Sequence, residues 1–155
     1  MVDDADDGNA PLFAELQERI MAELRRTYSP AVIDHWLNPR NFRTLEAADG
    51  FARNTGVCGD TMEMFVRVKN DRIVECAFQT DGCGTTVVCG SAATELASGK
   101  TFLDALGTVS ANGIVKVLGG LPEGSFHCAQ LAAETLRRAL ADFLSRKKEP
   151  WKKAT

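Results

Sequence analysis

The sequence predicts an α+β fold, in which helices cover one face of a small antiparallel sheet. Two runs rich in alternating apolar residues, 62–69 and 73–80, flank the turn-forming pair Asn70-Asp71, as in a β-hairpin. After residue 84 the apolar residues recur at helical spacing. Strands that precede helices favour segregated layers over alternating βαβ units. The length of 155 residues suits one domain with one core.

The N-terminal part predicts two helices before the sheet. Residues 1–10 are acidic and lack an apolar period, so we expect them to be disordered. A helix over 11–27 is indicated by an apolar stripe of Leu12, Phe13, Leu16, Ile20, Met21 and Leu24. Ser29-Pro30 reads as an N-cap with a first-turn proline, opening a short helix that reaches Trp36. Residues 42–57 show no clear period and are interpreted as a loop.

The hairpin predicts which side chains share a sheet face. In the first strand, period two places on one face Met62, Met64, Val66 and Val68. In the second strand it groups Val74, Cys76 and Phe78. Cys76 is therefore interpreted as a small buried hydrophobe.

The C-terminal half predicts four helices. The first begins after Cys83 and ends before Gly99, and Thr101 and Ser110 each cap a short helix. The last runs from about Cys128 to Ser145, with an apolar stripe of Leu131, Leu136, Leu140, Phe143 and Leu144. The single domain therefore spans 11–145, and 146–155 is a basic tail.

Charge and hydropathy exclude several classes of protein. The formal charge of −3 argues against a nucleic-acid partner. No apolar run approaches the roughly 20 residues of a membrane span. The acidic start resembles neither a signal peptide nor a mitochondrial presequence, so we expect a cytoplasmic protein.

Five cysteines in a reducing compartment point to metal or thiol chemistry more than to disulfides. Cys58, Cys83 and Cys128 lie at element boundaries, where functional groups concentrate. Two of them, Cys83 and Cys128, sit at expected helix N-termini, which favour a thiolate. Cys89 falls inside a helix and is interpreted as packing. The spacings of 25 and 45 residues match neither zinc ribbons nor ferredoxins. A shared metal site, unrelated structural thiols and a thiol enzyme all stay open on the residues alone.

Four motifs in order resemble those of IscU-type scaffolds, a family shared with the N-terminal domain of NifU. The first is Tyr28-Ser29-Pro30 with Asp34-His35 and Asn38-Pro39-Arg40-Asn41. The others are Cys58-Gly59-Asp60, Gly82-Cys83-Gly84 and His127-Cys128. The resemblance runs from about Tyr28 to Phe143, which is most of the chain.

The resemblance implies a scaffold, and not an enzyme, that builds a labile [2Fe–2S] cluster and transfers it to apo-proteins. It implies a small antiparallel sheet packed against helices, and a cluster held by Cys58, Cys83 and Cys128 with Asp60 and His127 beside it. Its partners would be a cysteine desulfurase of the IscS/NifS type, apo Fe–S acceptor proteins, and donors of iron and electrons. A homodimer stays open.

The fourth ligand would be Asp60 or His127, because only three cysteines lie at boundaries. Asp60 could also cap a turn, and His127 could be a capping or surface histidine, whereas His35 is interpreted as structural. Such a mixed ligand set should hold a cluster less tightly than four thiolates do. That weakness suits transfer.

Two rival interpretations compete with this one, and one partner is disfavoured. Zinc binding is the alternative function, since three cysteines with Asp60 or His127 suit that metal equally well. A nucleophile–base pair of Cys128 and His127 has poor geometry, because neighbours on a helix point about 100° apart. A dedicated Hsp70-type chaperone is disfavoured. The Leu-Pro-Pro-Val-Lys segment of its clients is replaced here by Leu121-Pro122-Glu123-Gly124-Ser125.

Overall fold

A computed structural model of the chain describes residues 10–148. Its element order is α1 (Ala10–Thr27), α2 (Pro30–Leu37), β1 (Gly50–Thr55), β2 (Thr61–Lys69), β3 (Arg72–Thr80), α3 (Gly84–Ala97), α4 (Phe102–Thr108), α5 (Ala111–Val117) and α6 (Phe126–Lys148). The three strands form one antiparallel sheet in the order β1-β2-β3. The predicted α+β class is confirmed. No helix in the described part is long and apolar enough to cross a bilayer.

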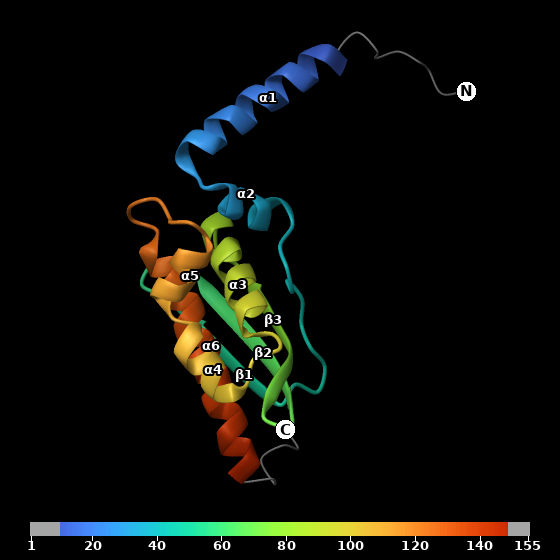
Figure 1. Cartoon of the computed structure of the whole chain (residues 1–155), viewed down its shortest axis with the longest axis vertical. Coiled ribbons are helices and arrows are strands. Elements are labelled where there is room, and N and C mark those ends of the chain that lie inside the picture. Colours follow the sequence, from blue (N-terminus) through green and yellow to red (C-terminus); the bar gives the residue numbers. More distant parts are fainter. Residues whose placement is uncertain (1–9, 149–155) are drawn as a thin grey trace, which may run out of the picture.

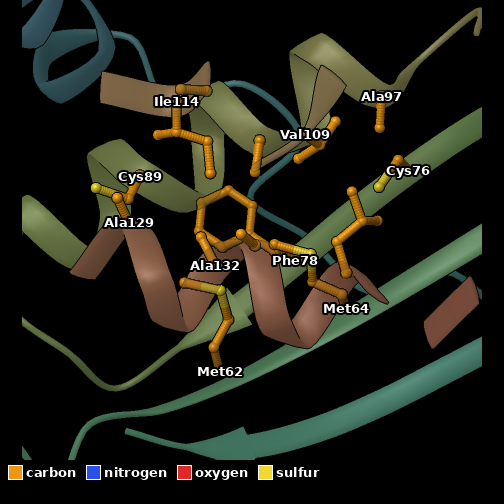
Figure 2. Packing of buried hydrophobic residues seen from close by; sticks show 14 of the residues in the cluster. Met62, Met64, Cys76, Phe78, Cys89, Ala97, Val109, Ile114, Ala129 and Ala132 are labelled. Atoms are coloured by element: carbon orange, nitrogen blue, oxygen red, sulfur yellow. The ribbon is translucent and has the colours of Figure 1, made fainter. Parts of the chain in front are cut away.

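The helices after the sheet gather over one of its faces (Figure 1). Helix α6 packs on β1 and β2, α3 packs on β3, and the two helices contact each other. Between them and the sheet lies the core shown in Figure 2, in which Met62, Met64 and Phe78 meet Cys89 and Ala132. A side chain at Gly90 would collide with the Phe78 ring at 2.5 Å, so this glycine lets α3 approach the sheet.

The structure corrects the sequence analysis at β1. We expected residues 42–57 to form a loop, but Gly50–Thr55 pairs with β2 along its length. Gly50 needs its missing side chain, because a Cβ would lie 2.4 Å from the Ala139 carbonyl oxygen of α6. Residues 41–43 also line up beside β3, where the Phe78 amide donates to the Asn41 carbonyl at 2.9 Å and the Arg43 amide donates to the Phe78 carbonyl at 3.0 Å.

The predicted hairpin is confirmed, but the sheet face of one side chain was predicted wrongly. Asn70 and Asp71 both adopt positive φ in the turn between β2 and β3. The register slips at Arg67/Val68, so Val68 pairs with Ile73 and Val74 is left over as a bulge. Ile73 therefore points into the core and Val74 is 43% exposed, although we had grouped Val74 with Cys76 and Phe78.

The ends of the chain agree with the predictions only in part. Helix α1 is present, but none of its residues is buried. Helix α6 starts at Phe126 and continues through Lys148, so the first residues of the expected basic tail are helical. The rest of that tail and residues 1–9 lie outside the described residues.

Candidate functional site

Cys58 lies in the loop that joins β1 to β2. The bonds that shape this loop are local: the Gly56 amide donates to the Asp60 carbonyl at 2.9 Å, and the Gly59 amide donates to the Gly56 carbonyl at 3.0 Å. Gly59 turns the chain with φ +88, which favours glycine. The result is a projecting tip where Cys58 is exposed and Val57 is 94% exposed.

Cys83 is the N-cap of α3, and Cys128 lies in the first turn of α6. Cys83 is exposed and Cys128 is buried. Both sulfurs contact the hydroxyl of Thr86, at 3.6 Å from Cys83 Sγ and 3.5 Å from Cys128 Sγ. Two cysteines that lie 45 residues apart in the sequence thus meet at one hydroxyl group.

Asp60 joins the same group from the β1–β2 loop. Its Oδ2 accepts a hydrogen bond from the Thr86 hydroxyl at 2.8 Å. The carboxylate therefore reaches across to α3, and this contact argues against a role confined to capping its own turn. The loop also lies beside α6, since a Cβ on Gly56 would be in ordinary contact with Leu131.

His127 is adjacent to the buried thiol. Its Nε2 lies 3.5 Å from Cys128 Sγ. The ring borders a shallow pocket of about 230 Å³ between the β1–β2 loop and α6, which Val57 and Leu131 also line. Contacts of 2.8 to 3.6 Å thus link Asp60, Cys83, His127 and Cys128, with Thr86 between them. Cys58 lies at the tip of the same loop as Asp60.

Comparison with known proteins identifies the family. The sequence model described as "NifU-like N terminal domain" matches residues 27–150. The chain belongs to this family.

Named relatives of this NifU-like domain agree with that assignment. An iron–sulfur cluster assembly scaffold protein IscU of Archaeoglobus fulgidus is 44% identical over 117 residues, covering 75% of this chain and 76% of the relative. The IscU of Aquifex aeolicus is 40% identical over 120 residues, covering 76% of each chain. The fold is also that of the N-terminal part of a nitrogen-fixing NifU-like protein from Brucella abortus. That structure has a TM-score of 0.59 at 16% identity, covering 76% of this chain and 94% of the other.

The two thiols that touch Thr86 in this NifU-like domain differ in acidity. The Thr86 backbone amide at the start of α3 lowers the pKa of Cys83, against the opposing effects of partial burial and the Asp60 charge. Burial raises the pKa of Cys128, and the nearby Cys83, Cys58 and Asp60 add to the rise. Cys83 is thus the more accessible and the more readily ionised of the two.

The remaining cysteines are part of the core, as predicted. Burial raises the pKa of Cys76 to about 12, and burial likewise raises that of Cys89. Both are free thiols packed among apolar side chains, which makes them poor ligands. Within residues 10–148, no three His, Cys, Asp or Glu side chains stand in a ready-made metal-binding geometry. The ligand set therefore stays a prediction.

The N-terminal motif of the NifU-like domain packs α2 against α3, the helix that begins after Cys83. Ser29 caps α2 through the Val32 amide, and its hydroxyl also donates to the Leu118 carbonyl. His35 is buried and holds Ser91 of α3 at 2.7 Å, which agrees with its structural interpretation. Trp36 packs against Gly84, where a Cβ would lie 3.0 Å from the ring, so α2 covers the start of α3 next to Cys83.

Sequence reasoning missed Thr86. A threonine in the first turn of a helix carries no signal by itself. Only the three contacts of its hydroxyl reveal its place in the site.

Proposed function

We propose that this protein is an iron–sulfur cluster assembly scaffold that builds a labile [2Fe–2S] cluster on Cys58, Cys83 and Cys128. The observation that carries the proposal is the meeting of Asp60, Cys83 and Cys128 at Thr86, in a chain whose relatives are named IscU scaffolds. The three cysteines come from a loop and two helix starts, so metal binding would join parts of the fold that the sequence keeps apart.

The difference in acidity between the thiols supports one cysteine as the acceptor of sulfur. Sulfur reaches the scaffold as a persulfide from a cysteine desulfurase of the IscS/NifS type, and the accepting thiol must be accessible and ionised. Cys83 satisfies both conditions best, because it is exposed and its pKa is lowered. Persulfide sulfur must then gain two electrons to become sulfide, so an electron donor is a required partner alongside an iron donor.

The incomplete set of thiolates supports release. Asp60 or His127 completes the ligand set, and neither is a thiolate. Apo Fe–S proteins that offer four thiolates would then hold the cluster more strongly. Such chemistry needs free thiols, which a reducing cytoplasm maintains. The scaffold transforms no substrate of its own and acts as sulfur acceptor and cluster donor.

Anaerobic reconstitution with iron and sulfide tests the proposal. We expect visible absorbance and Mössbauer spectra of a [2Fe–2S] cluster, together with equal amounts of iron and labile sulfide. Cys58→Ser, Cys83→Ser and Cys128→Ser should each abolish the stable cluster. Cys76→Ala and Cys89→Ala are the matched controls, since both thiols are buried in the core.

Two results would contradict the proposal. A full cluster spectrum in any of the three serine variants would remove that cysteine from the site. Zinc bound by these residues, with no uptake of iron and sulfide, would favour the alternative of a zinc protein.

A further inference from the structure

Thr86 occupies the centre of the candidate site without being a ligand type for iron. Its side chain is completely buried in the first turn of α3. The hydroxyl lies within reach of Asp60 on the β1–β2 loop, Cys83 at the helix start and Cys128 on α6. One oxygen atom thus touches three parts of the fold that supply candidate ligands.

The hydroxyl has only one proton to donate, and the distances indicate where it goes. Asp60 Oδ2 lies at 2.8 Å, whereas the two sulfurs lie at 3.5 and 3.6 Å. Oxygen is also the stronger acceptor, and a hydrogen bond to a carboxylate is charge-assisted. The Thr86 proton therefore belongs to Asp60, and the hydroxyl oxygen remains free to accept from a thiol.

Gly82 shows that the backbone makes room for this bond. A Cβ at Gly82 would lie 2.7 Å from Asp60 Oδ2 and 2.8 Å from Thr86 Cβ. Any side chain there would push apart the two groups that the hydrogen bond joins. The glycine before Cys83 is thus required by the contact between the loop and α3.

The bond matters because the Cys58 loop has few other ties at its tip. Its backbone bonds between Gly56, Gly59 and Asp60 are internal to the loop and do not hold it to the helices. Thr61, next to Asp60, is held by Asp81 at 2.8 Å, which fixes the base of the loop only. The Asp60–Thr86 bond connects the loop directly to the helix that presents Cys83.

We propose that Thr86 is a positioning residue, which docks the Cys58 loop on α3 by donating to Asp60 and so sets Cys58 relative to Cys83 and Cys128. This inference rests on the proposed function for its purpose, although the docking itself exists without metal. A loop that is already held in place loses less conformational entropy when metal binds, so the free-energy cost of binding is smaller. The loss of the bond should therefore loosen the loop first and weaken metal binding as a result.

The first test measures loop order in the metal-free full chain by ¹H–¹⁵N heteronuclear NOE. We expect Thr86→Val, which keeps the shape and removes the hydroxyl, to lower the NOE of residues 57–60. Thr86→Ser should restore the wild-type values. Thr135→Val is the matched control, because Thr135 is equally buried but its hydroxyl, among residues 10–148, bonds only the Leu131 carbonyl of its own helix.

A double-mutant cycle then separates docking from general destabilisation. Asp60→Ala removes the acceptor of the same bond, so it should loosen the loop as much as Thr86→Val does. The double variant should be no looser than either single variant. Additive loosening, or a loop in Thr86→Val as ordered as in the wild type, would overturn the inference.

A second test uses Zn²⁺ alone in competition with a chromophoric chelator. We expect Thr86→Val to bind Zn²⁺ about tenfold more weakly, the size of a hydrogen bond to a charged group. Thr86→Ser should bind it as the wild type does, and an undiminished affinity in Thr86→Val would contradict the positioning role.

The measurements of loop order and of cluster assembly distinguish the inference from the proposed function. A wild type that fails to assemble a cluster, with a loop that still depends on Thr86, would disprove the function and leave the docking intact. A wild type that assembles the cluster, with a loop whose order does not depend on Thr86, would support the function and overturn the docking.

Discussion

At the scale of single residues, His35 is a buried imidazole whose role is to hold the fold. The Arg40 backbone amide donates to Ser91 Oγ at 2.8 Å, so the Ser91 hydroxyl proton is free to point at His35 Nδ1. Burial lowers the pKa of His35 and Arg40 adds to this effect, while Glu95 and Asp34 oppose it.

His35 should make stability depend on pH. Its pKa in the folded state is below the ordinary 6.5, so the unfolded chain takes up the proton first as the pH falls. The stabilisation is complete above 6.5 and is lost as the pH drops below that value towards the folded pKa. Urea unfolding between about pH 7.5 and about pH 5 should show a steeper loss in the wild type than in His35→Gln. Equal slopes in the two proteins would contradict this assignment.

The residues of the site differ in how far the sequence could predict them. Cys58, Cys83 and Cys128 stand out because they lie at element boundaries, whereas Cys76 and Cys89 lie inside a strand and a helix. Thr86 does not, because its importance comes from a hydrogen bond between positions 26 residues apart. Such long-range polar contacts follow from packing and leave no local pattern.

At the scale of elements, the helices and the β2–β3 hairpin were predictable because caps, turns and apolar periods mark them. Strand β1 was not, since Gly50-Phe51-Ala52-Arg53-Asn54-Thr55 has little β-branched content and obtains its structure by pairing with β2. The sheet face of Val74 was predicted wrongly for another reason. A bulge shifts the period of two by one residue, and nothing in the strand sequence announces it.

Helix α1 is an amphipathic helix that the domain leaves uncovered. It contacts α2 but contributes nothing to the core, and Figure 1 shows it extending from the body. Its apolar stripe remains in solvent, with Leu12, Phe13, Leu16 and Ile20 more than half exposed. Residues 10–26 also precede the segment that matches the family.

Removal of residues 1–26 should therefore hardly affect the fold. We expect the free energy of unfolding to change by less than about 1 kcal/mol, because none of the described residues that are removed, 10–26, is buried. Leu136→Ala, on the buried face of α6, should cost about 2–5 kcal/mol in the same urea titration and would show that the assay detects packing. A loss after truncation as large as that of Leu136→Ala would mean that α1 packs on the domain.

At the scale of the whole molecule, the candidate ligands connect the β1–β2 loop, α3 and α6 at one end of the sheet. A metal bound at these residues would bridge elements that only the folded chain brings together. A ligand that prefers the folded state stabilises it by mass action.

Zn²⁺ should therefore raise the unfolding temperature of the metal-free protein. At a free concentration about a hundredfold above the dissociation constant, the gain is about 2.7 kcal/mol. Cys128→Ser should lose most of the gain, and excess chelator should reverse it in the wild type. If Zn²⁺ does not change the unfolding temperature of the wild type, these side chains do not bind the metal together.

The burial of Cys128 beside the open Cys83 also affects how the protein would age under oxidative stress. Peroxide attacks thiolates that it can reach, so sulfenic acid should form at Cys83 well before Cys128. Cys76 and Cys89 would be spared inside the core. Damage would thus accumulate at the rim of the candidate site while the interior stayed intact, leaving a folded protein that has lost one of its candidate metal ligands.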